Sequence, residues 1–388
     1  MTRGITAVVA VLAALALGMY LGGHPSDLPQ PLRDVFVDEN ASVQAEATDI
    51  IRDNYYRSVG GARLRDASLR GMVRSLNSRF SHYFTPRENA LFRQATSGEF
   101  SGVGMTVVEH PRGLRVAGVF DDSPAKRAGI RPGDVITRVN GRSIAGQASD
   151  VSTARIKGKE GTQVRLTIRR GKRTLQVRTR RERIRVPAVS SAARRARGQK
   201  LAVIELAGFT SGAHGELVRE VKRRERNGAE GFVLDLRANG GGLLDEAVLV
   251  SSAFVPRGVI VTTKGRKRPR RVFKATGEVA TRKPVVVLVD RGTASASEIV
   301  TAALHERLGA PVVGRRTFGK GVFGQIFDLS NGGALDLVVG NYYTPEGRNL
   351  NGKGIRPDIQ SEDDPDTTRD EALQRALNTL AGRVERTG

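Results

Sequence analysis

The chain has 388 residues, enough for two or three domains with a sizeable core, and it contains no cysteine, which excludes disulfides, thiolate metal sites and a cysteine nucleophile. Its 63 basic residues outnumber 40 acidic ones and give a formal net charge of +23, which suits an anionic partner such as a nucleic acid, a membrane surface or a cell wall. The basic residues are dispersed, aromatic residues make up only 5% and Trp is absent, so we expect a generally charged surface and no nucleic-acid partner.

The amino-terminal segment predicts a membrane anchor. Residues 4–23 are almost uninterruptedly apolar and uncharged, and about twenty such residues can span a bilayer. Arg3 precedes the run and predicts that the rest of the chain lies outside the cytoplasm, in a periplasm or at the cell exterior. We therefore expect residues 1–23 to be the uncleaved signal anchor of a single-pass protein of the cell membrane, with a cleaved signal peptide as the alternative. The proline-containing residues 24–40 form a predicted linker.

Residues 41–94 form a predicted helical region. Apolar residues recur at helical spacing over 41–55 and again over 64–76. His82 follows these helices, and we interpret it as a structural surface histidine rather than a catalytic group.

Residues 95–184 resemble a PDZ domain, a β-rich module. Two stretches carry the resemblance, SGVGMTVV from residue 101 and VFDDSPAKRAGIRPGDVITRVNG from residue 119. The glycines free the backbone so that consecutive N–H groups can face the terminal carboxylate of a peptide, which then adds as a strand. The predicted carboxylate-binding residues are Gly102, Val103, Gly104 and Met105. A helix over 148–156 would line the peptide groove, and a β-rich module without peptide function is the alternative.

Residues 185–365 alternate predicted strands and helices, which favours an α/β core. Apolar patterns predict strands over 201–206, 232–236 and 285–289, and an amphipathic helix over 213–225. The glycine turn at 239–242 lacks the Lys-Ser/Thr that a phosphate loop needs. The basic stretch 257–271 is a predicted solvated loop or hairpin, with contact to a polyanion as the alternative. Residues 366–388 hold a predicted C-terminal helix.

The strand at 285–289 leads into the candidate catalytic stretch. A short turn follows it, and a pattern of helical period begins at residue 294 with ASASEIV. Many hydrolases present a serine nucleophile on such a strand-to-helix turn, because N–H groups at the helix start face the developing oxyanion. Local chemistry leaves Thr293, Ser295 and Ser297 as candidates, and a simple N-cap is the alternative.

The candidate base is Lys320. His305 lies ten positions after Ser295 on the same predicted helix, which is about 15 Å along the axis and too far for a hydrogen bond. Apolar surroundings favour a neutral lysine amine that can accept a proton. The neighbours of Lys320 in the sequence are two glycines and three apolar residues, Phe318, Val322 and Phe323. A solvated Gly-Lys-Gly turn is the alternative.

The stretch TASASEIV, with VVGRRTFGKG downstream, resembles the carboxyl-terminal processing, or tail-specific, proteases. These are serine peptidases with a Ser/Lys dyad, a PDZ domain and an α/β core of the ClpP/crotonase-like kind. In that family the lysine follows the serine by twenty-five residues, which selects Ser295 with Lys320, since 320 − 295 = 25. The resemblance implies a serine endopeptidase without metal or cofactor that recognises apolar or unstructured C-termini of protein substrates through its PDZ domain.

The resemblance also implies the remaining site residues. The turn NGGG resembles the family's NPGG turn, which supplies one oxyanion N–H, here Gly241 with Gly242 as a near-equal alternative, while Ala296 supplies the other. The family often places a glutamine four residues after the lysine, where this chain has Gly324. Gln325 is one residue further, and one step along a strand turns a side chain to the opposite face. Gln325 is therefore a third catalytic residue only if a bulge re-aims it.

Two rival interpretations stay open. The displaced glutamine favours a catalytically weak or inactive PDZ scaffold or chaperone on the same fold, and only the net charge favours a nucleic-acid-binding protein. Glu306 stands where many family members carry Asp, and we expect it to orient structure rather than react. The sequence also leaves a homo-oligomer open.

Overall fold

The computed structural model describes residues 39–364 and 366–387. The chain divides into two compact units, residues 1–85 and residues 86–388. The predicted anchor at 1–23 and nearly all of the predicted linker lie outside the described residues. Among the helices that are described, none is long and apolar enough to cross a membrane.

The first unit contains two helices and a short strand: α3 (Glu39–Asn54), α4 (Gly61–Arg74) and β1 (His82–Phe84). Both helices form where the spacing of apolar residues predicts them. The Tyr83 hydroxyl donates to Asp66 Oδ1 at 2.8 Å and ties β1 to α4. His82 is exposed, as expected of a surface histidine. Large apolar side chains of these helices are also exposed, among them Val43, Ile50 and Met72.

In the second unit, α5 (Pro86–Ser97) leads into a β-rich module. Strands β2 (Glu99–Gly102) and β9 (Glu182–Arg185) pair antiparallel where the chain enters and leaves it. Between them lies a sheet of order β3-β4-β5-β7-β8, with β6 paired to β5. Its strands are β3 (Met105–His110), β4 (Gly113–Val119), β5 (Val135–Val139), β6 (Arg142–Ser143), β7 (Gln163–Arg170) and β8 (Arg173–Arg180). Two helices complete the module, α6 (Pro124–Arg127) and α7 (Ser149–Ile156).

The α/β core is built on a six-stranded sheet of order β10-β11-β12-β15-β16-β19. Only β10 and β11 pair antiparallel; the other neighbours are parallel. The strands are β10 (Val189–Ala196), β11 (Gln199–Leu206), β12 (Gly231–Asp235), β15 (Val285–Val289), β16 (Val312–Gly314) and β19 (Ile359–Gln360). Every residue of β12 and β15 is buried, as expected for continuous apolar runs in a sheet that is covered on both faces.

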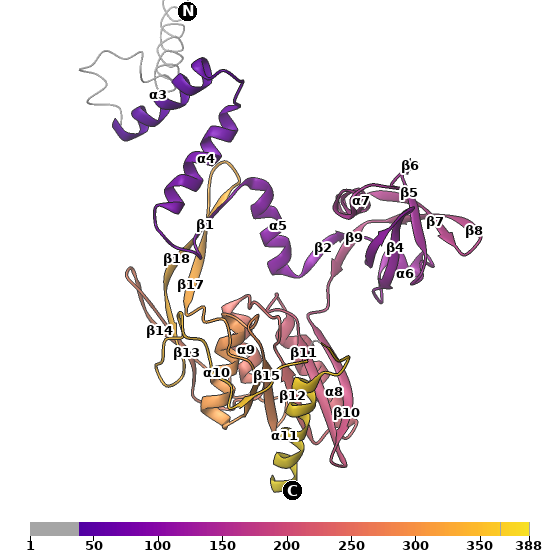
Figure 1. The fold of residues 1–388 in the computed structure, drawn as a ribbon, viewed down its shortest axis with the longest axis vertical. Helices are drawn as coiled ribbons and strands as arrows, with labels where there is room; N and C mark the ends of the chain where they lie inside the picture. The colour runs from indigo at the N-terminus through magenta and orange to yellow at the C-terminus, as the bar shows by residue number, and fades with distance from the viewer. Residues whose placement is uncertain (1–38, 365, 388) are drawn as a thin grey trace, which may run out of the picture. The chain divides into compact units, whose positions relative to one another are not determined.

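Helices cover both faces of this sheet (Figure 1). Alternate residues of a strand face opposite sides. In β12, Phe232 and Leu234 share a core with α8 (Ala213–Arg226), α9 (Leu244–Ser252) and α10 (Ala296–Leu308). Val233 instead packs with α11 (Glu371–Thr387), the predicted C-terminal helix. The result is a three-layer α/β/α arrangement.

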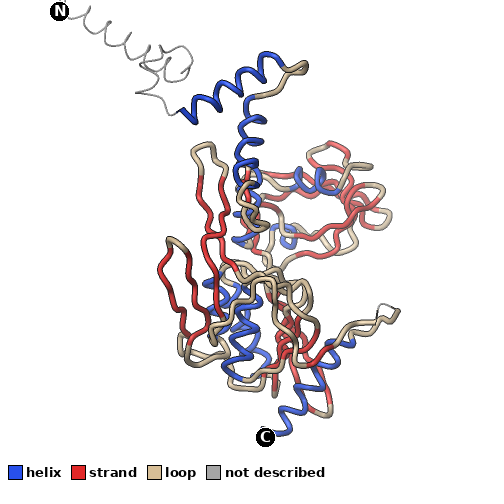
Figure 2. Tube along the Cα trace, turned by 60° about the vertical axis from the view of Figure 1, so that its left-hand side comes forward, coloured by secondary structure: helices blue, strands red, loops and turns tan. Residues whose placement is uncertain are grey.

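A second sheet in the core has the order β18-β13-β14, with β17 paired to β18. Its strands are β13 (Val259–Gly265), β14 (Arg268–Lys274), β17 (Val322–Asp328) and β18 (Ala334–Tyr343). They form the long red hairpins of Figure 2. The basic stretch that was predicted as a loop or hairpin is thus the hairpin β13–β14.

Candidate active site

Ser295 caps the amino end of α10, directly after the turn that leaves β15. Its backbone has φ 57° and ψ −115°, a conformation that costs a non-glycine residue about 1–3 kcal/mol and tends to occur at functional sites. The turn is fixed from the glycine turn that follows β12, because the Asn239 carbonyl accepts from Ala294 N at 3.0 Å and from Ser297 Oγ at 2.9 Å. The surrounding structure therefore holds the serine in its strained geometry.

The structure separates the three hydroxyls that local chemistry left open. Thr293 is buried, and its Oγ1 donates to Leu236 O at 2.8 Å. Ser297 is also buried, and its hydroxyl donates to Asn239 O. Only Ser295 of the three is partly exposed. Its side chain is thus the one that a substrate can reach.

The glycine turn after β12 packs against the serine. Asn239 is fully buried, and its Nδ2 donates to Leu206 O at 2.6 Å. Gly241 has φ +102°, and a Cβ there would lie 2.9 Å from both Ser295 Cβ and Ala296 N. Only glycine fits at this position, so the turn and the start of α10 are in direct contact, as the predicted oxyanion site requires.

The two glycine candidates for the oxyanion site differ in their N–H groups. Gly241 N donates to Asn239 Oδ1 at 2.9 Å and is already engaged. Gly242 forms a parallel bridge with Phe209. In this bridge Phe209 N donates to Gly241 O and Phe209 O accepts from Leu243 N, so the N–H of Gly242 takes no part. Among the described residues, the N–H groups of Gly242 and Ala296 have no acceptor. These two N–H groups are therefore available to a ligand in this conformation.

A buried carboxylate joins the serine turn to the lysine loop. Glu298 has 0% exposure, and its Oε2 accepts from Ser295 N and from Lys320 N, each at 2.9 Å. Its Oε1 accepts from Thr317 Oγ1 at 2.6 Å and from Gly319 N at 2.8 Å. A buried carboxylate is stable only when its oxygens are hydrogen-bonded, and here four donors meet that need.

Tyr342 makes a second link between the two segments. Its hydroxyl contacts the carbonyl oxygens of Ser295, at 3.3 Å, and of Lys320. Tyr342 is 2% exposed; burial, and then the charge of Glu298, raise the pKa of its phenol well above the ordinary value. The phenol therefore stays protonated and acts as a neutral hydrogen-bond donor to both carbonyls.

Lys320 lies in the loop between β16 and β17 and is half-buried. Of its predicted apolar neighbours, Val322 is buried and Phe323 half-buried. Phe318 is 45% exposed and is thus less buried than these two neighbours. The reason is local: Thr317 and Gly319 turn inward to Glu298, which leaves the intervening side chain outside.

Comparisons with known proteins bear on this arrangement. Residues 200–361 match peptidase family S41, and residues 101–180 match the PDZ domain. The chain is 34% identical to "Probable CtpA-like serine protease" of Staphylococcus aureus (strain COL) over 384 residues, which cover 98% of the chain and 74% of that protein. It is 33% identical to "Carboxy-terminal processing protease CtpA" of Bacillus subtilis (strain 168) over 360 residues, 92% of the chain and 76% of that protein.

The chain belongs to the CtpA-like carboxy-terminal processing proteases of family S41. The resemblance seen in the sequence is thereby confirmed, as is the expectation of a serine-type carboxyl-terminal protease with a PDZ domain. The structure resembles "Photosystem II D1 C-terminal processing protease", with a TM-score of 0.51 and 28% identity over 88% of this chain and 98% of that one. An S41 protease from Bacteroides fragilis NCTC 9343, with a TM-score of 0.52 and 20% identity over 87% and 97%, shares the fold.

The predicted carboxylate-binding loop of the PDZ domain is anchored through its carbonyl groups. Val103 O accepts from Ala125 N at 2.8 Å, and Gly104 O accepts from Phe120 N at 3.1 Å. Gly104 has φ +80°, and a Cβ there would lie 2.3 Å from Ser123 Cβ. Among the described residues, the N–H groups of Val103 and Gly104 have no acceptor. They are therefore available to an anion, and Met105 begins the adjoining strand β3.

Gln325 is not among the residues that the structure brings to Ser295. It is exposed on β17, and its Oε1 accepts from Arg268 of β14. The register of β17 and β18 does shift, since Phe323 pairs with Gly340 and Gly324 with Val338. The extra residue is in β18, so the alternation along β17 is unchanged and this bulge does not re-aim Gln325.

Glu306, which we expected to orient structure, lies at the far end of α10. Its side chain accepts from Glu346 N at 2.7 Å and also binds Arg348.

Sequence reasoning missed Glu298 and Tyr342. Glu298 had a detectable signal, since Ser followed three residues later by Glu is the capping-box pattern of a helix start. Tyr342 had none, because its contacts depend on how β18 packs.

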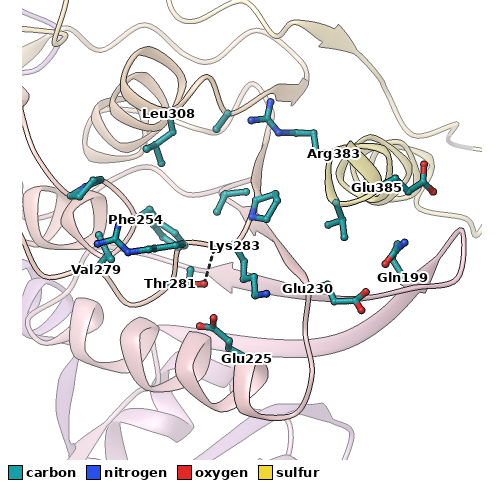
Figure 3. A pocket seen from close by; sticks show the side chains of 16 residues that line it. Gln199, Glu225, Glu230, Phe254, Val279, Thr281, Lys283, Leu308, Arg383 and Glu385 are labelled. Carbon is teal, nitrogen blue, oxygen red and sulfur yellow. Dashed lines mark hydrogen bonds between the residues drawn. The ribbon is translucent and has the colours of Figure 1, made fainter. Parts of the chain in front are cut away.

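A sizeable pocket of the second unit lies away from these residues. A cavity of about 990 Å³ opens at the amino ends of β12 and β15, opposite the end where Ser295 follows β15. Figure 3 shows its mixed lining, which includes Phe254, Leu308, Glu230 and Lys283. None of the candidate catalytic residues lines it.

Among the described residues, no group of three or more His, Asp or Glu side chains is arranged to hold a metal ion.

Proposed function

We propose that this protein is an extracytoplasmic endopeptidase in which Ser295 is the nucleophile and Lys320 the general base. The observation that carries the proposal is the shared carboxylate: Glu298 binds the main-chain N–H groups of both residues. This arrangement supports a dyad, because it draws the lysine loop to the one reachable hydroxyl of the serine turn.

The proposed reaction is acyl transfer through Ser295. The neutral amine of Lys320 takes the proton of Ser295 Oγ as the oxygen attacks the scissile carbonyl carbon. The N–H groups of Ala296 and Gly242 stabilise the resulting oxyanion. The lysine returns the proton to the leaving amine, and water then hydrolyses the acyl-enzyme with the lysine again as base. Gly241 supports the site by its close packing and by holding Asn239.

The proposed substrates are proteins with apolar or unstructured C-termini. The carboxylate would bind the free N–H groups of Val103 and Gly104, and the tail would add as a strand to β3, which is an edge strand of its sheet.

We further propose that residues 1–23 anchor the protein in the cell membrane with the protease outside the cytoplasm. The uncharged apolar run after Arg3 supports this placement. Recovery of a soluble chain that starts near residue 24 would contradict the anchor.

The dyad is tested with the full chain in mild detergent and an unstructured reporter with an apolar C-terminus. We expect the wild type to cleave the reporter and Ser295→Ala to leave it intact. Ser330→Ala, the same change at an exposed serine in the turn between β17 and β18, is the control and should cleave normally. A wild type that binds the reporter without cleaving it would instead favour a scaffold or chaperone, the rival that the position of Gln325 supports.

A further inference from the structure

The hairpin β13–β14 carries seven basic residues and no acidic one. All seven, here called the hairpin cations, are exposed: Lys264, Arg266, Lys267, Arg268, Arg270, Arg271 and Lys274. In the part of the chain that the structure describes, none of them forms an ion pair with a carboxylate. Arg268 binds the amide oxygen of Gln325, and Arg271 lies over the Phe273 ring at 5.3 Å.

Basic residues in other parts of the second unit often have carboxylate partners. Examples are the pairs Arg93–Asp328, Arg127–Glu182 and Arg170–Asp134. Seven unbalanced like charges on one hairpin repel one another. An edge strand such as β14 can carry charged residues and a proline that prevent pairing with other chains. Charges of either sign serve that purpose, so it does not explain why all the charged residues here are positive. The charge distribution of the hairpin is therefore typical of a surface that binds an anionic partner.

The hairpin adjoins the proposed dyad through a single strand. In the register of β13 and β18, Thr263 lies opposite Tyr342 and Lys264 opposite Asn341. Tyr342 is the residue whose hydroxyl contacts the carbonyl groups of Ser295 and Lys320. Neighbouring strands lie about 4.8 Å apart. Figure 1 shows β13 and β14 beside β18 on the same side of the core as α10.

We propose that the hairpin cations bind acidic segments of the substrate beside the scissile bond, so that the enzyme prefers polypeptides with clustered Asp and Glu close to the cleavage site. This inference rests on the proposed function and adds a substrate class to it. Charge of one sign near a site raises the encounter rate of oppositely charged ligands by roughly 10- to 1,000-fold at low salt. At 1 M salt the screening length is only about 3 Å, so the preference should then largely disappear.

The test uses two unstructured reporters with the same apolar C-terminus, so that recognition by the PDZ domain is equal. One carries a cluster of Asp and Glu upstream, and the other carries Ser and Asn at the same positions. The measured quantity is the ratio of kcat/KM for the acidic reporter to that for the neutral one. The wild-type ratio should be about 10 or more at low salt and approach one at 1 M salt.

The hairpin variant replaces Arg266, Lys267 and Arg270 by Gln, because the side chains of these three cations form no hydrogen bond or ion pair within the described residues. The control replaces Arg194, Arg195 and Lys222 by Gln, which removes the same charge from exposed positions on β10 and α8. The ratio should fall toward one in the hairpin variant and stay at the wild-type value in the control. An equal ratio in wild type and hairpin variant would overturn the inference, as would an equal fall in both variants.

Binding to Ser295→Ala keeps the inference testable if the proposed function fails. The dissociation constants of both reporters can then be compared with and without the three hairpin substitutions. A hairpin-dependent preference for the acidic reporter supports the inference even when no variant cleaves. Hairpin-dependent binding to phosphatidylglycerol vesicles, without any preference between the reporters, would assign the cations to a lipid surface and overturn it.

Discussion

The main-chain N–H groups of Ser295 and Lys320 donate to one and the same oxygen, Oε2 of Glu298, at 2.9 Å each. The two residues are twenty-five positions apart in the sequence, yet one buried side chain sets their separation. Any change in the length or charge of that side chain should therefore disturb the serine and the lysine together.

Glu298→Gln tests this coupling. The amide keeps the size of the side chain but replaces one acceptor oxygen by an NH₂ group, which would face N–H donors. We expect kcat to fall roughly 100-fold, the cost of misplacing catalytic groups by about 1 Å. The free energy of unfolding should fall by about 1–3 kcal/mol, because buried donors lose their acceptor. Steady-state kinetics and denaturant unfolding measure the two effects, and wild-type kcat in Glu298→Gln would show that the carboxylate does not position the dyad.

Gly241→Ala tests the contact between the glycine turn and the serine. The added Cβ would lie 2.8 Å from Ala294 O and 2.9 Å from Ser295 Cβ, at a φ that disfavours alanine. We expect a loss of roughly 100-fold in kcat, since the serine or the turn must move. Gly240→Ala is the matched control, because a Cβ there meets nothing within 4 Å. If the two variants were equally active, the turn would not shape the site.

The position of the strands was largely predictable from the sequence, but their pairing was not. The runs 232–236 and 285–289 read as buried strands because a parallel sheet covered on both faces needs continuous apolar residues. The strand β18 lacks such a run, and its side chains are mostly half-buried. Its pairing with β13 depends on residues that are distant in the sequence, which no local pattern reports.

The candidate site was predictable where a motif fixes the backbone and unpredictable where packing decides. The serine turn and the glycine turn follow from short motifs with required glycines. The exposure of Phe318 and the contact of Gln325 with Arg268 depend on tertiary structure. The choice between Gly241 and Gly242 was also beyond the sequence, since it depends on the hydrogen bond from Gly241 N to Asn239.

The stability of the PDZ domain should fall at acid pH because the Asp134 carboxylate becomes protonated. Burial raises the pKa of this carboxyl, but hydrogen bonds from Arg170 and from Arg131 N outweigh burial, so the pKa lies below its ordinary value of 3.8. A carboxylate with a depressed pKa stabilises the fold above the unfolded pKa and loses this effect as pH falls through the folded pKa. Asp134→Asn should therefore destabilise the domain most at neutral pH, and the difference should shrink below pH 3.8.

Amide hydrogen exchange of β5 in the full chain, measured from neutral to acid pH, follows this difference. Asp121→Asn is a control, because that side chain is 90% exposed and should matter little at any pH. A constant difference between wild type and Asp134→Asn across the whole pH range would contradict the assigned role of the carboxylate.

Recognition of the substrate tail should depend on its terminal charge. The free N–H groups of Val103 and Gly104 suit a carboxylate, and a C-terminal amide carries no charge. We expect the amidated reporter to bind Ser295→Ala at least several-fold more weakly than the acid form, since hydrogen bonds to charged groups contribute about 1.5–3 kcal/mol. Fluorescence anisotropy with both peptides measures the change. Equal affinities would remove carboxylate recognition from the account.

The central claim is that Lys320 is the base for Ser295, and Lys320→Arg tests it most directly. Arginine keeps a positive charge and similar length, but it retains its proton at any working pH and cannot accept another. The account predicts that cleavage of the unstructured reporter by Lys320→Arg falls to the background of Ser295→Ala, with reporter binding retained. Substantial cleavage by Lys320→Arg would contradict the dyad and require another base.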